Sequence, residues 1–131
     1  MISSTKNDQV KMVVELRKKA KARNEAGLFV AEGLRMVSEL PPDRAWRLYV
    51  SESFLKNREN AGLLERFSRY EIVTDQVFSA MSDTQTPQGI LALAKQYEYV
   101  LSDLLSAPGP AHLMILENLQ DPGNLGTILR A

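Results

Sequence analysis

The last twenty residues, His112-Leu113-Met114-Ile115-Leu116-Glu117-Asn118-Leu119-Gln120-Asp121-Pro122-Gly123-Asn124-Leu125-Gly126-Thr127-Ile128-Leu129-Arg130-Ala131, are typical of an α/β protein. The apolar run 112–116 indicates a strand, and a turn rich in Pro, Gly and Asn separates it from the opening of an apolar helix. Ligands of open α/β sheets bind beyond the carboxyl ends of strands, so we expect ligand-binding or catalytic residues at this junction. Gly123 and Gly126 would let a backbone approach a phosphate or a ribose closely.

The residues upstream alternate between helical and extended patterns. Apolar spacing predicts helices at 6–22, 32–40 and 59–69 and a brief helix through Val77, Phe78 and Met81, with extended segments or strands at 28–31, 46–51, 71–74 and 90–94. In the first strand after Pro41-Pro42, the residues Trp46, Leu48 and Val50 alternate with Arg47, Tyr49 and Ser51, which indicates a strand with one buried face. The continuous run 90–94 indicates a strand buried on both faces. We therefore expect an α/β fold: a small layered α/β/α domain over residues 1–97, a linker at 98–111, and the start of a second domain at 112–131.

Composition narrows the class of protein. The chain has 131 residues, no cysteine and a single histidine, which excludes disulfides and makes a metal site hard to build. No apolar run is long enough to cross a bilayer, and the N-terminus lacks the apolar core of a signal peptide. The sequence thus predicts a cytoplasmic protein without membrane or metal partners.

Positive charge gathers at the N-terminus although the formal net charge is +0. Residues 1–23 contain seven basic and two acidic side chains, a local charge of +5. Such a segment is typical of phosphate binding, and a solvated helix face is the alternative.

Two patterns carry a family resemblance. The spacing Asp121-Pro122-Gly123-Asn124-x-Gly126-x-x-x-Arg130 resembles the first signature motif of the SpoU-type (TrmH-like, SPOUT superfamily) RNA ribose 2'-O-methyltransferases. The segment 23–33, with a basic residue followed by Gly27-x-Phe29-x-x-Glu32-Gly33, resembles the opening of that family's substrate-binding domain, and the segment 86–90 resembles one of its loops.

The resemblance implies RNA, from tRNA or rRNA, as the substrate and S-adenosylmethionine as the methyl donor. It also implies a knotted SPOUT catalytic domain and a parent protein that is a homodimer. We expect RNA contacts from a set of polar side chains: Lys11, Lys18, Lys19, Lys21, Arg23, Glu32 and Gln88. For Glu32 a structural role, capping a helix or holding Arg23, is the alternative.

The catalytic residues implied are Asn124 and Arg130, with Glu117, Asp121, Gly123 and Gly126 supporting the loop. A guanidinium with a pKa above about 12 is a poor proton acceptor, so we expect Arg130 to stabilise the developing oxyanion or to clamp a phosphate. Asn124 would orient Arg130 or the ribose, and a helix N-cap is its alternative role.

The family's two downstream motifs, which build the donor pocket, the knot and the dimer interface, are absent from these 131 residues. We therefore expect an N-terminal piece that is inactive alone and that self-associates through the exposed strand 112–116. Two other classes stay open. A stand-alone RNA-binding module needs only the basic helix and the α/β domain, whereas a P-loop protein would require a Lys-Ser/Thr pair that does not follow Gly126.

Overall fold

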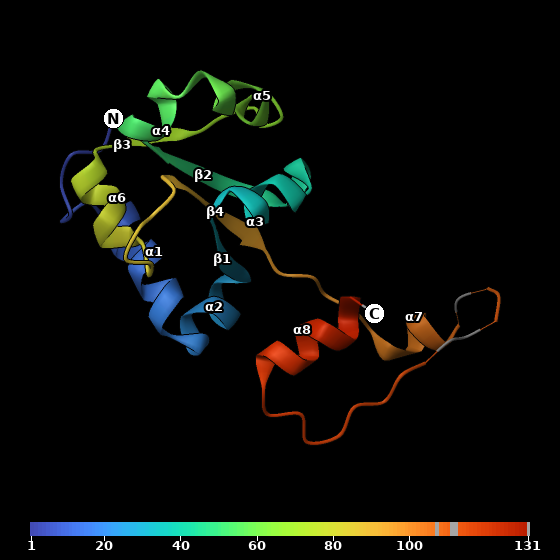
Figure 1. Cartoon of the computed structure of the whole chain (residues 1–131). Helices are drawn as coiled ribbons and strands as arrows, with labels where there is room; N and C mark the ends of the chain where they lie inside the picture. Colours follow the sequence, from blue (N-terminus) through green and yellow to red (C-terminus); the bar gives the residue numbers. More distant parts are fainter. Residues whose placement is uncertain (107, 111–112, 131) are drawn as a thin grey trace. The chain divides into compact units, whose positions relative to one another are not determined.

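The computed structural model describes residues 1–106, 108–110 and 113–130 and divides into two compact units, Met1–Tyr97 and Glu98–Ala131 (Figure 1). The first unit contains the four-stranded sheet, and the described residues of the second unit include two helices. Among the described residues, no helix has the length and apolarity needed to cross a membrane.

A four-stranded mixed sheet in the order β1-β4-β2-β3 forms the middle of the first unit. Its strands are β1 (Leu28–Glu32), β2 (Ala45–Ser51), β3 (Glu71–Val73) and β4 (Ile90–Lys95). Strand β4 runs antiparallel to both neighbours, and β2 runs parallel to β3. Residues 90–94 of β4 are all buried because strands pair with it on both sides and helices cover both faces, which confirms the prediction from its apolar run.

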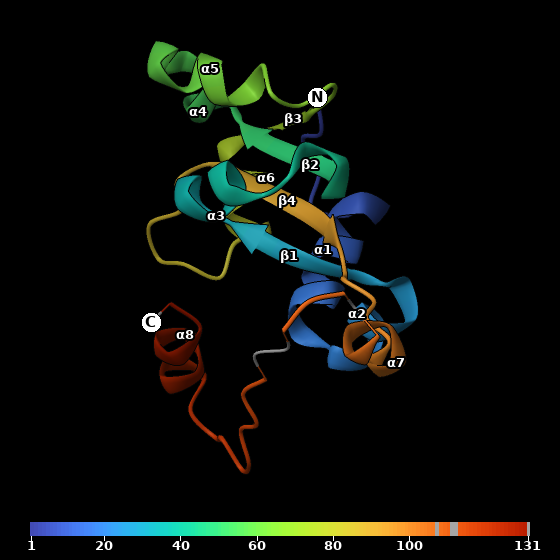
Figure 2. The ribbon, with the colours of Figure 1, turned by 90° about the vertical axis from the view of Figure 1, so that its right-hand side faces the viewer.

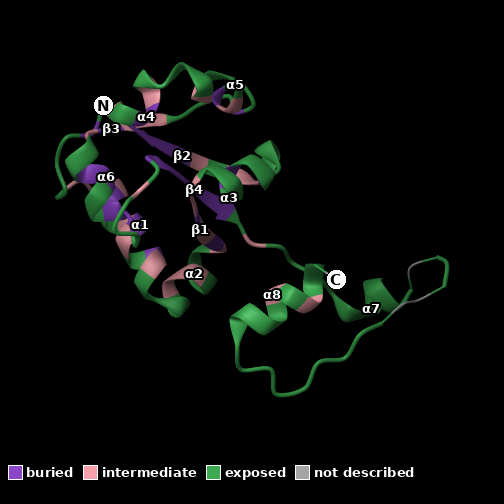
Figure 3. Cartoon of the chain, viewed as in Figure 1, coloured by how far each residue is buried: buried purple, intermediate pink, exposed green. Residues whose placement is uncertain are grey.

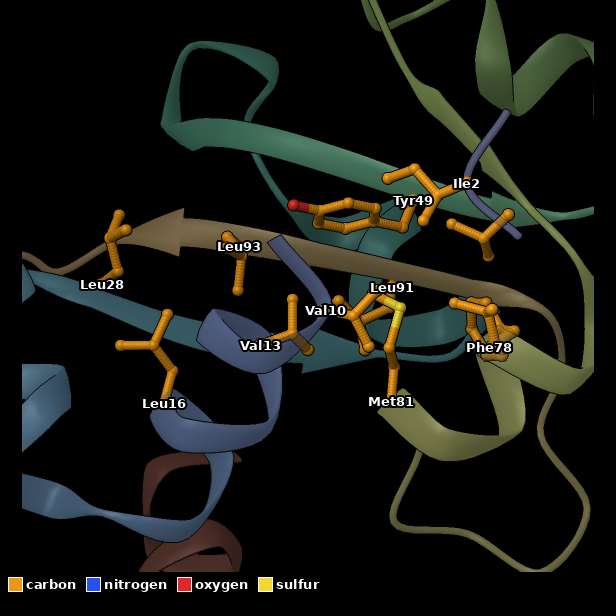
Figure 4. Close-up of a cluster of buried hydrophobic side chains, with 12 residues drawn as sticks. Ile2, Val10, Val13, Leu16, Leu28, Tyr49, Phe78, Met81, Leu91 and Leu93 are labelled. Atoms are coloured by element: carbon orange, nitrogen blue, oxygen red, sulfur yellow. The ribbon is translucent and has the colours of Figure 1, made fainter. Parts of the chain in front are cut away.

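One face of the sheet is covered by α1 (Asp8–Lys18) and α6 (Asp75–Met81). The Asn7 side chain caps α1 and the Thr74 hydroxyl caps α6. Figure 4 shows the buried side chains between these helices and the strands: Ile2, Val10, Val13, Leu16, Leu28, Tyr49, Phe78, Met81, Leu91 and Leu93. Burial raises the pKa of the Tyr49 hydroxyl, which donates to Gln9 Oε1 at 3.2 Å.

The opposite face is covered by α3 (Leu34–Glu39), α4 (Glu52–Lys56) and α5 (Ala61–Leu64), with the short 3₁₀ turns η1 (Pro42–Arg44) and η2 (Arg58–Asn60) between them (Figure 2). Val37, Phe54 and Phe67 lie in this second apolar cluster. The buried residues line both faces of the sheet, whereas the outer helix surfaces are exposed (Figure 3). The expected α/β/α layering is therefore confirmed.

Two expected helices are shorter than their apolar patterns. The helix expected at 6–22 ends at Lys18, and α2 (Ala20–Ala26) follows after the extended residue Lys19. The Arg23 guanidinium donates to the carbonyls of Leu16 and Arg17, at 2.8 and 3.0 Å, and so satisfies the end of α1. The helix expected at 59–69 is reduced to η2 and α5, because the N–H groups of Arg66 and Phe67 bond three residues back and Phe67 packs into the core.

The alternation of buried and exposed residues expected in β2 is interrupted at Trp46. The pairing with β4 shifts between Ala45 and Arg47, which leaves Trp46 as the extra residue of a β-bulge. Trp46 is 44% exposed, and the residues that follow it, Leu48 to Ser51, are buried on both faces. The expectation of one buried face headed by Trp46 was wrong because the bulge re-aims that side chain.

The second unit contains α7 (Leu101–Leu105) and α8 (Pro122–Arg130). The expected strand 112–116 is absent, because Leu113–Leu116 have no partner among the described residues and are exposed, while His112 lies outside the described residues. A strand forms only when its N–H and C=O groups find a ladder, so an apolar run alone was insufficient. The helix expected after the turn is present as α8.

Candidate nucleic-acid interface

Three turns meet at one end of the sheet in the first unit. Strand β1 ends before Gly33, β2 ends at Ser51, and β4 begins after Gly89, so the antiparallel pairing of β4 with both neighbours brings these positions together. The Gly33 N–H donates to the Ile90 carbonyl at 3.0 Å, and the Ser51 N–H donates to the Gly89 carbonyl at 2.8 Å. The end of the segment 23–33 and the segment 86–90, both of which resemble parts of the family's substrate-binding domain, therefore meet at this end of the sheet.

Gln88 shapes this surface through its side chain. Its Oε1 accepts from the Leu34 N–H at 2.8 Å, at the start of α3. A Cβ on Gly33 would lie 2.8 Å from the same oxygen, and Gly33 has φ +93. Gly89 is equally constrained, since a Cβ there would lie 2.5 Å from Ser51 Oγ at φ +81. Glycine is required at both positions by backbone conformation and by space.

Glu32 holds the loop that precedes Gln88. The hydroxyl groups of Ser82 and Thr84 donate to its Oε1, and the Asp83 N–H donates to its Oε2 at 3.3 Å. Arg17 holds the same loop from α1, donating to the Met81 carbonyl at 2.6 Å. Of the two structural alternatives for Glu32, neither pairing with Arg23 nor capping a helix is found. Its carboxylate instead fixes residues 82–84.

A pocket of about 540 Å³ opens beside this loop. Its lining includes the polar side chains of Ser53, Asn57, Asn60, Asp75 and Gln88. Both the N–H and the hydroxyl of Ser53 donate to the Asp75 carboxylate, at 3.1 and 2.6 Å, and these hydrogen bonds lower the pKa of Asp75. The pocket thus presents amide donors and acceptors beside one carboxylate, a set suited to hydrogen bonds with a polar ligand that lacks a phosphate at this point.

The lysines expected to bind RNA are exposed along α1 and the start of α2, but several already have carboxylate neighbours. Lys11 pairs with Asp8 at 3.0 Å, Lys19 with Glu15 at 2.9 Å, and Lys21 with Glu25 at 3.7 Å. Exposed pairs of this kind contribute only about 0.2–1 kcal/mol, so a phosphate can displace the carboxylate. Lys18 makes no ion pair with any described residue. Arg23 differs from the lysines because its guanidinium caps α1.

In the second unit, Asp121 caps α8, its Oδ1 accepting from the Gly123 N–H at 2.9 Å. Asn124 therefore lies inside the helix and is not its N-cap, so the alternative role expected for it is wrong. Pro122 occupies the first helical position, where its missing N–H leaves no hydrogen bond unmade. Gly123 and Gly126 are helical too, so they form no phosphate-cradling loop of the P-loop kind.

Asn124 and Arg130 are both exposed on α8, six residues apart and hence about 120° apart around the helix. No hydrogen bond joins them in the described part of the chain. Arg130 instead lies over Gly126, one turn back, where a Cβ would stand 3.6 Å from a guanidinium nitrogen. Glu117 is exposed and bonds to no other described residue.

Sequence reasoning missed the residues that support the interface: Arg17 as a loop anchor, Ser82 and Thr84 as partners of Glu32, and Ser53 as the partner of Asp75. These contacts join residues far apart in sequence, which helical and strand periodicity does not detect. The one available signal was the polar run 82–86 directly before the segment 86–90.

Comparison with known proteins agrees with this geometry. Residues 7–92 match the family described as the MRM3-like substrate binding domain. The chain is thus a substrate-binding α/β domain with an additional C-terminal segment. Because the match covers most of the chain, the protein belongs to the MRM3-like substrate-binding domain family, and the resemblance to SpoU-type methyltransferases is confirmed.

Individual relatives extend the match beyond residue 92. The chain is 31% identical over 130 residues to 23S rRNA (guanosine(2553)-2'-O)-methyltransferase RlmP of Bacillus subtilis (strain 168), covering 98% of this chain and 48% of that protein. It resembles the crystal structure of an RNA 2'-O ribose methyltransferase with a TM-score of 0.72 and 28% identity, covering 98% of this chain and 50% of that one. An AdoMet-bound rRNA methyltransferase from Sinorhizobium meliloti shows 25% identity and a TM-score of 0.56, with 78% and 38% covered. The chain spans about half the length of the Bacillus protein.

Proposed function

We propose that this chain binds RNA as the substrate-binding part of an RNA ribose 2'-O-methyltransferase and contributes that enzyme's first catalytic motif. The observation that carries the proposal is the Gly33–Gln88 surface, because it lies within the segment that matches the substrate-binding family and the Gln88 side chain gives it an exposed polar face. RNA is the substrate class named for the relatives that cover nearly all of this chain.

The basic helix supplies the sequence-independent part of binding. Lys11, Lys18, Lys19 and Lys21 are exposed, and each that meets a phosphate releases counterions and strengthens binding at low salt. Lys18 contributes most directly because it has no carboxylate neighbour to displace. Arg23 acts indirectly, by holding the end of the helix that carries the lysines.

Glu32 acts as a positioning residue in this proposal, whereas Gln88 both positions the turn at Leu34 and contacts the RNA. Glu32 is a carboxylate, which repels phosphate, and its oxygens are already engaged with Ser82, Asp83 and Thr84. The Gln88 oxygen is engaged with Leu34, which leaves its amide N–H₂ to donate to a base or a phosphate.

Arg130 is the proposed catalytic residue. In methyl transfer, the bond from the ribose 2'-oxygen to the methyl carbon would form as the methyl–sulfur bond of the donor breaks and leaves a neutral thioether. The 2'-hydroxyl proton would pass to water, so partial negative charge develops on the 2'-oxygen. The Arg130 guanidinium stabilises this charge or clamps the adjacent phosphate, since its pKa above about 12 excludes it as a base. Asn124, on a different side of α8, contacts the ribose rather than Arg130. Asp121 fixes the start of the helix.

S-adenosylmethionine would supply the methyl group. Residues 113–130 are exposed except for half-buried Gly126 and Ile128, so the described residues of this segment form no enclosed cradle for a nucleoside. We assign the donor site to the remaining half of the relatives' length. The proposal extends to a cytoplasmic homodimer acting on tRNA or rRNA.

The test uses a protein that joins this chain to the remaining half found in its relatives. Labelled S-adenosylmethionine and RNA should yield a 2'-O-methylated nucleoside. Arg130→Ala should reduce turnover by at least about 10²-fold, as loss of a transition-state donor does, with donor binding unchanged. Turnover that survives Arg130→Ala would contradict the catalytic assignment.

A stand-alone RNA-binding module is the second candidate. The observation that favours it is that Met1–Tyr97 contains both apolar clusters and the entire sheet. This candidate predicts that replacing Arg130 leaves the RNA affinity unchanged. It also predicts no methyl transfer by any protein that contains the chain.

A further inference from the structure

A second groove lies at the end of β2 remote from the Gly33–Gln88 surface. It surrounds the β-bulge where β2 begins and has a volume of about 380 Å³. Its lining includes Trp46, Arg47, Phe67, Arg69, Tyr70 and Glu71, and we call it the Trp46 groove. The ends of β2 are separated by a seven-residue strand, so a ligand in this groove is distinct from one at Gln88.

Aromatic rings are unusually accessible at the Trp46 groove. Trp46 is 44% exposed and Tyr70 is 41% exposed, whereas Phe67 beneath them is buried. The bulge is the cause for Trp46, because it takes the side chain out of the alternation that would bury it. Bulges that re-aim a side chain at the edge of a sheet are common beside binding sites.

Arginines accompany these rings without carboxylate partners. The Arg47 guanidinium lies 4.6 Å from the centre of the Trp46 ring, and Arg44, next to the groove, lies 4.2 Å from that of Tyr97. Neither arginine, nor Arg69 in the wall, is within ion-pair distance of a carboxylate among the described residues. By contrast, Arg17 and Arg35 do have acidic partners.

We propose that the Trp46 groove binds a single-stranded segment of the RNA substrate, an inference that rests on the proposed function. Bases stack on Trp46 and Tyr70, and the guanidinium groups of Arg47 and Arg69 pair with the flanking phosphates. Rings interleaved with arginines that lack carboxylate partners suit this occupant, because every base offers a π-face and every nucleotide a negative charge. Glu71, the acidic group in the lining, disfavours phosphate at its own end of the groove and so directs the backbone toward Arg47 and Arg69.

Trp46 is the only tryptophan of the chain, so its fluorescence reports on this groove alone. The whole chain is titrated with end-labelled single-stranded oligoadenylate, and binding is followed by anisotropy of the label and by tryptophan emission. Emission should fall in parallel with binding, because stacking quenches the indole. Trp46→Ala and the double variant Arg47→Gln/Arg69→Gln should each weaken binding about tenfold.

Trp46→Phe retains a ring and should keep most of the affinity, which separates stacking from a folding defect. Arg58→Gln removes an exposed arginine outside the groove lining and is the matched control. Thermal unfolding of each variant checks the fold. If the unaltered chain binds with constant Trp46 emission, or if Trp46→Ala binds equally well, the Trp46 groove does not bind the RNA. Either result would leave the proposed function intact. If Trp46 emission changes with protein concentration in the absence of RNA, a second copy of the chain occupies the groove, which would contradict the proposal. No binding of oligoadenylate would also overturn the assignment of the Trp46 groove, while the proposed function would be contradicted only if the chain also failed to bind structured rRNA.

Discussion

Gly33 and Gln88 stand so close that a Cβ on Gly33 would lie 2.8 Å from Gln88 Oε1. The same oxygen accepts the Leu34 N–H, so Gln88 joins the β1–α3 turn to the loop before β4. Leu34 and Gln88 are 54 residues apart in sequence, and the hydrogen bonds from Gly33 to Ile90 and from residues 82–84 to Glu32 hold the same two segments together.

Gly33→Ala is expected to destabilise the first unit by about 1–3 kcal/mol, because the residue has φ +93 and its new methyl group meets Gln88. Chemical denaturation measures the loss. Gly62→Ala is the matched control: Gly62 is helical with open space around it, so alanine should be neutral or stabilising by up to about 1 kcal/mol. Equal stability of the two variants would show that the Gly33 turn is unstrained.

Glu32→Gln should loosen residues 82–84, since the charged acceptor of three hydrogen bonds becomes a neutral amide. The expected cost is about 1–2 kcal/mol, with faster hydrogen exchange at the Asp83 and Thr84 amides. Glu39→Gln removes an exposed carboxylate paired with Arg35 and should change stability by less than about 0.5 kcal/mol. If exchange at Asp83 is unaltered in Glu32→Gln, Glu32 does not hold the loop.

The pKa of Asp75 predicts a specific pH dependence. Hydrogen bonds from Ser53 lower the folded-state pKa below the ordinary 3.8, so the stabilisation is fully present above about pH 3.8 and is lost as pH falls through the lower folded value. Asp75→Asn should therefore be less stable than the unaltered chain at pH 7, and the difference should shrink below pH 3.8. Urea denaturation at several pH values checks this. A difference that grows on acidification would have the wrong sign.

Several elements were predictable because their signals are local. Ile90–Ala94 is apolar at every position, Thr74 precedes a helical pattern, and Gly27 adopts the left-handed backbone that glycine tolerates, with φ +62. These features depend on neighbours within one or two turns, so the sequence pattern contains them.

Other features depend on partners that periodicity cannot see. The bulge at Trp46 exists only in the pairing of β2 with β4, and the run 113–116 needs a neighbouring strand to become one. The start of α8 was predictable in principle, since Asp121-Pro122 is a cap followed by proline at the first helical position. At the candidate site, Glu32 and Gln88 were proposed from the resemblance, whereas the residues they contact, Ser82 and Leu34, were not anticipated.

The exposed run 113–116 predicts self-association. Leu113, Met114 and Ile115 are 66%, 71% and 92% exposed, and burying each such side chain is worth about 1.5–3 kcal/mol. Light scattering of the chain should show a dimer or larger species, and Ile115→Asp should shift it toward monomer. A version ending at Ala107 provides the comparison. If all three chains are equally monomeric, residues 112–116 mediate no pairing.

RNA binding by the 131-residue chain as a function of salt tests the central claim most directly. Titration of a labelled structured rRNA fragment should give an affinity whose logarithm falls linearly with the logarithm of salt concentration. Lys18→Ala should reduce the slope by about one unit, and the triple variant Lys18/Lys19/Lys21→Ala by roughly one unit for each of these lysines that neutralises a phosphate. An affinity that is absent at low salt, or that is unaffected by salt and by these lysines, would contradict the assignment of this chain as an RNA substrate-binding domain.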